Sequence, residues 1–546
     1  MGDFNGDTIA DVAVGSPKID VGNTDSGAVF ILFLDSDGTV DSHQRICTSS
    51  GGFTGYILDS NYRFGSSVAS AGDIDADGVT DLFVGAVGSP DGGGTNFGVC
   101  FILFLDTNAF VTSFQKVGAI HGGFTGSLIS NDWFGSSVEL VLDLNGDGTD
   151  ELAVGTNKKD ESGVQDTGAV YIIFLQPNGQ VLSHVKIGYG SAGGFTGTLD
   201  SKDYFGCAVG QPGDIDHDGI SDLVVGAYRD DQGGTDFGAV YVFFLQSSGD
   251  VASHQKLASG VGGFTGSNSI DDFGFDVSPA GDFNFDGSQD IIVGARRDGD
   301  SATDSGAVYM IFLDTAGVCI SHLKLSGTST HFGTFTAVLD ASNYFGNQAS
   351  IAGDINLDGS LDLIIGAFGD TDGGASDTGA VFIVFMPNCV IRPSPGSSVT
   401  TEVFLNDADT LQITCDNGYY GGGTISCSSA NGLTGQFCSA LPYPTDAPTD
   451  APTDAPTDAP TDAPTSASDP NTDPGTTDPG TGTDSDPDTN SDPDQDDGND
   501  ATSSTLLTLY TSDLLFWNSA DSHHSCITYS FFFSLQFWIL PALFNF

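Results

Sequence analysis

The sequence predicts an all-β fold assembled from repeated four-stranded sheets, and three observations carry this prediction. An acidic segment recurs six times before residue 390. The 546 residues include 75 Gly and 40 Phe but only 3 Met, a composition typical of many short strands joined by tight turns. The repeated region also lacks the spacing of apolar residues that an amphipathic helix would show.

The acidic segments mark units of nearly constant length. They begin at Asp3, Asp73, Asp143, Asp214, Asp282 and Asp354, which are 68 to 72 residues apart. In the unit from 64 to 133, residues 64–71 and 82–85 are predicted strands that flank the acidic loop. An apolar strand at 99–105 and a last strand around 114–120 follow, and a Gly-Gly-Phe-Thr-Gly linker leads to the next unit.

Four strands per unit predict the blade of a β-propeller. A β-solenoid would repeat over a much shorter period, and a string of independent sandwiches would need about 100 residues per unit. Six acidic loops predict six blades. The first unit lacks its first strand and the last stops after residues 380–386, where a fourth strand is due. A truncated ring of seven would explain these uneven ends.

Each acidic loop follows the pattern D-x-[DN]-x-D-G-x-x-[DE], except that Thr8 replaces Gly in the first. Alternate residues of an extended turn point the same way, so the first three oxygen-bearing side chains converge. A Gly at offset 5 lets the backbone bend back. Five to seven oxygen ligands with two to four carboxylates suit Ca²⁺ better than Mg²⁺.

The candidate metal ligands occupy offsets 0, 2, 4 and 8 of each loop. The alternative is that these segments are Asx-rich hairpin turns, but a turn needs only one or two such residues. Two carboxylates about 4 Å apart repel by roughly 4 kcal/mol at an effective dielectric near 20, so the loops should fray without a cation. The candidates are Asp3, Asn5, Asp7, Asp11, Asp73, Asp75, Asp77, Asp81, Asp143, Asn145, Asp147, Glu151, Asp214, Asp216, Asp218, Asp222, Asp282, Asn284, Asp286, Asp290, Asp354, Asn356, Asp358 and Asp362.

The charge balance narrows the possible partners. The formal net charge is −59, from 14 basic and 73 acidic residues. Nucleic acid and anionic membrane both need a basic patch, so neither is an expected electrostatic partner.

The combined motifs resemble FG-GAP repeats, which form the N-terminal propeller of integrin α chains and occur in many microbial and protist surface proteins. The resemblance rests on Phe-Gly strands such as Phe64-Gly65, on the acidic loop that follows, and on Val-Gly-Ala sequences such as residues 225–227. It covers residues 1 to 388. It implies a seven-bladed propeller, Ca²⁺ in the acidic loops and an extracellular binding role.

A ligand face is predicted opposite the acidic loops. Successive connections of an up-and-down blade alternate between its two ends, so the loops after Val-Gly-Ala share this face with the linkers. Six of the 14 basic residues lie in these loops, and they suggest an acidic or glycan ligand. The alternative is that they balance nearby aspartates. They are Lys18, Lys158, Lys159, Arg229, Arg296 and Arg297.

Catalytic constellations are not recognised in the sequence, so an enzyme is not expected. His43, His184, His254 and His322 recur about one blade apart, too far for a single metal site, and are expected to pack within the blades. A nucleophile with a base, a glycine-rich phosphate loop and zinc-ligand spacing are all missing.

A small disulfide-rich β module is predicted at residues 389–440. Its cysteines resemble those of a sushi module, which implies the pairs Cys389–Cys427 and Cys415–Cys438. A generic two-disulfide domain is the alternative. Clustered cysteines favour an oxidising compartment.

The C-terminal part is predicted to anchor the protein. Residues 441–517 are rich in Pro, Thr and Asp and suit a disordered, O-glycosylated stalk. The tail at 518–546 ends in about 17 mostly apolar residues and fits a GPI-attachment signal. A short membrane helix or a gene-model artefact are the other interpretations.

Together these features predict an extracellular, calcium-binding propeller that acts in cell adhesion or ligand binding at the cell surface, with a protein or glycan ligand and with membrane contact only through the tail. A secreted lectin or polysaccharide-acting enzyme is the alternative.

Overall fold

The computed structural model describes most of the repeated region and a set of short strands after it. The described residues are 4–7, 9–35, 39–266, 271–284, 286–327, 338–353, 355, 361–371, 379–386, 389–391, 403–405, 410–413, 419–420, 423–428, 432–434 and 439–440. Candidate ligands Asp3, Asp354, Asn356 and Asp358, the predicted disulfide pairs, the stalk and the tail therefore lie outside what is described. None of the described segments is a helix of the length and hydropathy needed to cross a membrane.

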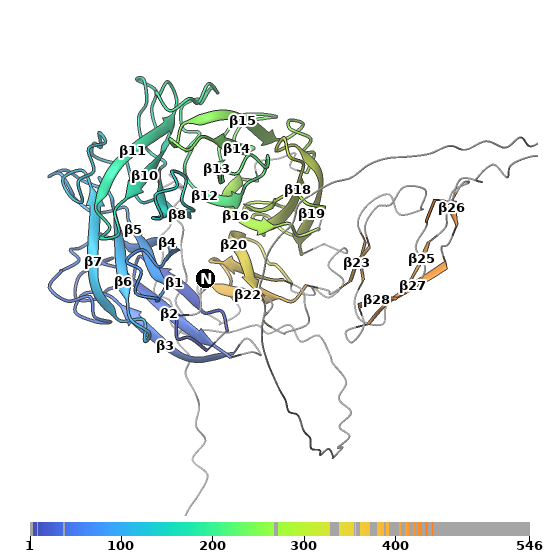
Figure 1. The fold of residues 1–546 in the computed structure, drawn as a ribbon, viewed down its shortest axis with the longest axis horizontal. Coiled ribbons are helices and arrows are strands. Elements are labelled where there is room, and N and C mark those ends of the chain that lie inside the picture. Colours follow the sequence, from blue (N-terminus) through green and yellow to red (C-terminus); the bar gives the residue numbers. More distant parts are fainter. Residues whose placement is uncertain are drawn as a thin grey trace, which may run out of the picture. The chain divides into compact units, whose positions relative to one another are not determined.

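Six antiparallel sheets are arranged as blades around a central axis (Figure 1), which confirms the predicted all-β, six-bladed propeller. Blades 2 to 5 each have four strands in simple meander order. Blades 1 and 6 have three described strands each. Blade 1 comprises β1 (Val12–Ser16), β2 (Ala28–Leu34) and β3 (Val40–Ile46), and blade 6 comprises β20 (Phe345–Gly353), β21 (Asp362–Ala367) and β22 (Ala380–Val384).

The four complete blades repeat the same pattern of strand lengths. Blade 2 is β4 (Phe64–Gly72), β5 (Asp81–Ala86), β6 (Val99–Leu105) and β7 (Val111–Gly118); blade 3 is β8 (Ser137–Val141), β9 (Glu151–Thr156), β10 (Ala169–Leu175) and β11 (Val181–Gly188). Blade 4 is β12 (Val209–Gly213), β13 (Asp222–Ala227), β14 (Ala239–Leu245) and β15 (Val251–Ala258); blade 5 is β16 (Phe273–Gly281), β17 (Asp290–Ala295), β18 (Ala307–Leu313) and β19 (Cys319–Ser326). The fourth strand of blade 2 begins three residues earlier than residue 114.

The third strand of each complete blade is a continuous apolar run. In β6, β10, β14 and β18 every residue is buried, because neighbouring blades cover both faces of the sheet. The fourth strand is more exposed and carries the polar residues. The core therefore consists of layers between blades, which is why apolar residues dominate the middle of each unit.

The linker phenylalanines close each blade against its neighbour. Phe195 of a Gly-Gly-Phe-Thr-Gly linker stacks on Phe205, with 5.7 Å between ring centroids, and lies 5.0 Å from the His254 ring. Phe124 with His184 and Phe264 with His322 repeat this contact. The prediction that the histidines pack within the blades is confirmed for these three, and burial lowers their pKa values. It is wrong for His43, which is exposed on β3 because no described linker phenylalanine covers it.

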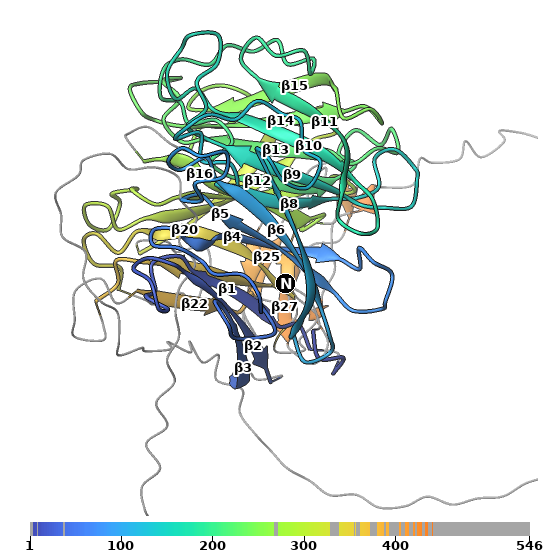
Figure 2. The same ribbon diagram turned by 90° about the vertical axis from the view of Figure 1, so that its left-hand side faces the viewer.

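The connections between strands lie at the two ends of the blades, as the side view in Figure 2 shows. The acidic loops join the first and second strands, so they lie at one end. The loops between the second and third strands lie at the other end, together with the linkers. The two faces proposed from the repeat pattern are thus distinct surfaces of the ring.

After the propeller, residues 389–440 contain seven short strands. They are β23 (Cys389–Ile391), β24 (Val403–Leu405), β25 (Thr410–Ile413), β26 (Tyr419–Tyr420), β27 (Gly423–Ser428), β28 (Gly432–Thr434) and β29 (Ser439–Ala440). They form two two-stranded sheets and one three-stranded sheet. A small β module here stays consistent with the prediction, whereas its sushi-like character is untested.

Candidate metal centres

The acidic loops fold around their first carboxylate. In blade 2 the two carboxylate oxygens of Asp73 accept hydrogen bonds from the backbone N–H groups of Asp77 and Gly78, both at 2.9 Å. Gly78 has a φ of 91°, as expected for the glycine at offset 5. The same pair of bonds is made by Asp143 in blade 3 and by Asp214 in blade 4. The loop sequence therefore builds one geometry in successive blades.

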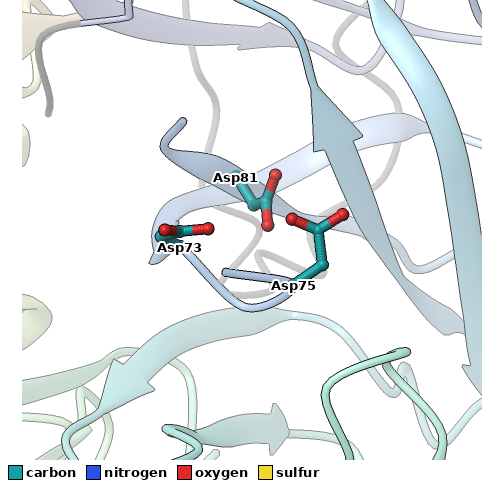
Figure 3. A group of neighbouring side chains, drawn as sticks. All are labelled: Asp73, Asp75 and Asp81. Carbon is teal, nitrogen blue, oxygen red and sulfur yellow. The ribbon is translucent and has the colours of Figure 1, made fainter. Parts of the chain in front are cut away.

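This geometry brings three carboxylates together in each of three blades. In blade 2 the side chains of Asp73, Asp75 and Asp81 point toward a common space (Figure 3). Each offers one oxygen, and these oxygens lie within 4.8 Å of one another. The corresponding groups are Asp143, Asp147 and Glu151 in blade 3 and Asp214, Asp216 and Asp218 in blade 4.

Like charges at this spacing destabilise one another. Two carboxylates about 4 Å apart repel by roughly 4 kcal/mol at an effective dielectric near 20. Burial raises the pKa of Asp81 to about 7; backbone hydrogen bonds oppose this shift, and the charges of Asp75 and Asp77 add to it. An all-oxygen cluster of this kind fits a hard divalent cation, which would neutralise the group.

In blade 5, a carboxylate oxygen without a hydrogen-bond donor is a further indication of a cation site. Oδ1 of Asp282 is buried and has no hydrogen-bond partner among the described residues, whereas Oδ2 accepts from Gly287 N–H at 3.0 Å. A buried carboxylate oxygen without a donor is costly unless a cation or water contacts it. Asn284 and Asp286 lie in the same loop, and their side chains are hydrogen-bonded to each other at 2.9 Å.

The acidic residue at offset 8 has a structural role that the sequence did not reveal. Asp81 is fully buried, and its two oxygens accept hydrogen bonds from Ile74 N–H and from Leu105 N–H, both at 3.1 Å. Leu105 ends the third strand, so this carboxylate joins the loop to a strand 24 residues away. Asp11, Asp222, Asp290 and Asp362 make equivalent pairs of bonds.

Blade 3 departs from this pattern through Glu151. Its carboxylate accepts from Leu144 N–H at 2.7 Å and from the Asn145 amide at 3.2 Å. Because Glu is longer than Asp, the Glu151 carboxylate reaches the side chain of Asn145 within its own loop. In blade 1, the Asn5 amide donates to Asp7 at 2.8 Å, and Asp11 accepts from Phe4 N–H at 3.0 Å.

On the opposite face, two of the six basic residues are buried in ion pairs. Lys159 Nζ lies 2.9 Å from Asp132, and Arg296 Nε lies 3.0 Å from Asp272. Both residues are less than 10% exposed. For Lys159 and Arg296, the alternative interpretation is therefore correct: each charge balances a nearby aspartate, and neither side chain is accessible to a ligand.

Four other cations of this face remain at the surface. Lys158 lies 3.8 Å from the centroid of the Trp133 ring, and Arg229 lies over Tyr204 and Tyr228. Arg297 pairs with Asp304 at 3.2 Å. Lys18 is also half-buried. Lys18, Lys158, Arg229 and Arg297 occupy the same position after the second strand of their blades.

Comparison with known proteins agrees with the repeat geometry. The FG-GAP repeat family matches residues 1–32, 134–173, 209–243 and 273–310. The matched segments contain the acidic loops and most of the apolar third strands of four blades, and two of them begin at the Phe-Gly pairs of blades 3 and 5.

The four FG-GAP matches, the integrin α relatives and the six described blades identify an integrin-α-like β-propeller. The chain is 34% identical to human integrin alpha-11 over 166 residues, which is 30% of this chain and 12% of the relative. It is 28% identical to Drosophila melanogaster integrin alpha-PS2 over 247 residues, or 44% of this chain and 16% of the relative. A Bos taurus phosphatidylinositol-glycan-specific phospholipase D is 31% identical over 223 residues, which is 40% of this chain and 25% of the relative. The aligned part of the chain thus spans a quarter or less of the length of these relatives.

Proposed function

We propose that this FG-GAP propeller binds calcium in its acidic loops and acts in cell adhesion or ligand binding at the cell surface. The observation that carries the proposal is the convergence of three carboxylates in each of blades 2, 3 and 4. Similarity to integrin α chains supports the adhesive role. The cysteine cluster and the stalk-like composition after residue 388 favour an extracellular location.

Calcium suits these loops better than magnesium. Asp73, Asp75, Asp77 and Asp81 of blade 2 offer carboxylate oxygens on one short, bent segment, and a backbone carbonyl at offset 6 can add another. Calcium accepts six to eight oxygens in flexible geometry, whereas magnesium demands a tight octahedron and keeps several waters. The cation would neutralise the carboxylates and hold the loop against the first and second strands.

Ligand binding is proposed for the face opposite the acidic loops. Its accessible cations, Lys158, Arg229 and Arg297, lie beside the aromatic rings of Trp133 and Tyr204 or beside an aspartate. A planar or acidic group of a protein or glycan could contact such mixed aromatic and cationic surfaces. The propeller would act by binding and not by catalysis.

Titration calorimetry of the whole chain tests the metal site. We expect saturable Ca²⁺ binding at several sites, weaker binding of Mg²⁺, and the loss of one site in Asp73→Asn. Asp106→Asn is the matched control, because Asp106 lies in a turn between the third and fourth strands of the same blade. Absence of saturable Ca²⁺ binding to the wild-type chain would contradict the proposal, and an equal number of sites in Asp73→Asn and wild type would contradict the site in blade 2.

Adhesion is tested separately with beads that carry the chain. Calcium-dependent binding of the beads to cells or to an array of glycans and matrix proteins is expected, and Arg297→Glu with Lys158→Glu should reduce it. The control Arg45→Glu reverses an exposed charge on β3, outside the loops of that face. A loss in Arg45→Glu as large as that in the double variant would contradict a role for the proposed ligand face.

A second candidate function is that of a secreted lectin or a hydrolytic enzyme. The phosphatidylinositol-glycan-specific phospholipase D among its relatives favours this candidate, since 223 residues of this chain align with that enzyme at 31% identity. Turnover of a polysaccharide or a phosphoinositol glycan by the purified chain would support it over adhesion. Glycan retention without turnover would support a lectin.

A further inference from the structure

The linker that enters blade 2 contributes two tyrosines to a pocket on the face opposite the acidic loops. The pocket has a volume of about 200 Å³ and lies beside the loop between β5 and β6. Three segments that are distant in the sequence meet there: the linker, this loop and the end of β7. Their lining residues include Tyr56, Tyr62, Ser89, Asp91 and Lys116.

The inner end of this pocket is a network of polar groups. Lys116 Nζ donates to the Tyr56 hydroxyl and to the Asp91 carboxylate, both at 3.0 Å. His121 Nδ1 lies 2.6 Å from the same oxygen of Asp91. Lys116 and Asp91 are only 9% and 5% exposed. The ammonium and the carboxylate therefore neutralise each other away from solvent, and the pocket has no unpaired cation to offer a charged ligand.

The two tyrosine hydroxyls give the pocket its hydrogen-bonding capacity. Tyr56 and Tyr62 are in hydrogen-bond contact with each other through their hydroxyl oxygens. That contact uses one of their two protons, and Lys116 accepts neither, because an ammonium only donates. Burial raises the pKa of Tyr62 above its usual range, so its hydroxyl stays protonated. One hydroxyl proton of the pair can therefore point to an acceptor within the pocket.

Blade 4 closes the corresponding group with its own side chains. Asp230 stands there at the position of Ser89, and it accepts from Lys256 Nζ at 2.6 Å. It also accepts from the Tyr241 hydroxyl at 2.9 Å. Blade 2 has a phenylalanine, Phe101, in place of that tyrosine and the shorter serine in place of the aspartate. Because serine and phenylalanine cannot form the closed group, the polar groups of blade 2 face a pocket. Blade 5 makes the closed group with Asp298, Tyr309 and Lys324.

The rim of the pocket combines apolar surface with a negative charge. Ile120 lines it and is 70% exposed. The rings of Tyr56 and Tyr62 meet edge to face, with 6.1 Å between their centroids. Asp59, which is exposed, lies on the same rim. A negatively charged ligand would be repelled by Asp59, whereas a neutral group with both hydroxyls and C–H surface would not.

We propose that this pocket binds one neutral monosaccharide unit of a glycan. The proposal rests on the proposed function of ligand binding at this face, and it gives the ligand a chemical class. Sugar hydroxyls would bond to the hydroxyl pair of Tyr56 and Tyr62, and the C–H surface of the sugar ring would pack against the Tyr56 ring and Ile120. A pocket of about 200 Å³ is smaller than a typical site for a drug-sized ligand, so it suits a single sugar unit.

Ligand-observed NMR on the full chain tests the pocket with the methyl glycosides of galactose, glucose, mannose and N-acetylglucosamine. We expect saturable binding of at least one of them. The methyl glycosides of glucuronic acid and sialic acid should bind more weakly, because their carboxylates meet Asp59. No saturable binding of any neutral glycoside, or tighter binding of an acidic one, would overturn the proposal.

Substitutions of the linker tyrosine locate the site. Tyr56→Ser introduces the residue type that blade 3 has at this position, and it should weaken glycoside binding about tenfold. Tyr56→Phe keeps the ring and its packing, and it should weaken binding about threefold through the lost hydroxyl alone. Tyr189→Ser is the matched control, since Tyr189 follows β11 on the same face and does not line the pocket.

Two results of this series would overturn the proposed site: equal affinities of Tyr56→Ser and wild type, or an equal loss in Tyr189→Ser. These outcomes are distinguishable from a failure of the adhesive function. Lys158 and Arg297, which the bead assay tests, do not line the pocket. Calcium-dependent adhesion without glycoside binding would overturn the pocket alone. Glycoside binding without adhesion of the beads to cells would support the pocket and contradict the adhesive role.

Discussion

The two faces of the propeller hold their loops by opposite electrostatic means. On the acidic-loop face, carboxylates such as Asp73 and Asp75 lie close together and are largely exposed. On the other face, buried cations pair with buried carboxylates, as in Lys159–Asp132 and Arg296–Asp272. Lys116–Asp91 repeats that pattern on a fourth strand. On two other fourth strands, the half-buried Lys256 and Lys324 pair with the buried carboxylates of Asp230 and Asp298.

This difference indicates which face depends on ions in solution for the stability of its loops. A buried ion pair carries its own neutralising charge, so its loop needs nothing from solution. A group of like charges is stable only when protons or a cation reduce the repulsion. Removal of divalent cations should therefore loosen one face of the ring and leave the other unchanged.

The largest effect is expected from breaking a buried pair. Lys159→Met leaves the Asp132 carboxylate buried without its cation, and it also removes the bond from Lys159 Nζ to the Ser127 carbonyl. We expect a loss of about 3–5 kcal/mol in the free energy of unfolding, equal with and without calcium. Denaturant unfolding measures it. Lys158→Met is the matched control, and a loss in Lys158→Met as large as that in Lys159→Met would contradict the assignment.

The carboxylate at offset 8 should give the next largest effect. Asp222→Asn keeps the shape but replaces one acceptor of the Ile215 and Leu245 backbone bonds by a donor. The expected loss is about 1–3 kcal/mol, again both with and without calcium. Thermal unfolding in both conditions provides the measurement. A loss confined to calcium-loaded protein would show that Asp222 acts mainly as a ligand.

Substitution of an exposed ligand should instead depend on the metal. Asp216→Asn relieves repulsion within the blade 4 group, so stability without calcium should stay within about 0.5 kcal/mol of wild type. Calcium affinity at that site should fall about tenfold, because one charged ligand is lost. Calorimetry and unfolding in EDTA measure the two quantities. Destabilisation in EDTA comparable to that of Asp222→Asn would remove the distinction between the two positions.

The smallest effect is expected at a half-exposed pair. Arg297 and Asp304 lie 3.2 Å apart, and their side chains, 28% and 20% exposed, are partly screened by solvent. Arg297→Gln should change the free energy of unfolding by only about 0–1 kcal/mol, and less at high salt. Urea unfolding at low and high ionic strength is the check. A loss of more than about 1 kcal/mol in the free energy of unfolding that does not depend on salt would show that the Arg297–Asp304 pair behaves as a buried ion pair.

Local features of the chain were predictable from the sequence. The position of the acidic loop between two strands, the apolar third strand at 99–105 and the glycine at offset 5 all follow from short-range patterns. Each depends on residues within a few positions of one another. The packing of His184, His254 and His322 was also predictable from their recurrence once per blade, whereas the exposure of His43 was not.

Long-range features were not predictable. The pairing of Asp81 with Leu105 N–H joins residues 24 positions apart, and its pattern in the sequence is the same as that of a metal ligand. Adjacent Lys158 and Lys159 look alike in the sequence, yet one lies over Trp133 and the other is buried beside Asp132. Whether a loop side chain is buried or exposed depends on how neighbouring blades pack against each other. This packing cannot be read from the sequence of a single repeat.

Hydrogen–deuterium exchange with and without calcium tests the contrast between the faces most directly. The account predicts that calcium slows amide exchange in the loops at 73–81, 143–151 and 214–222, while the loops at 157–168 and 228–238 exchange equally in both conditions. Exchange that calcium leaves unchanged in the acidic loops, or slows equally on both faces, would contradict it.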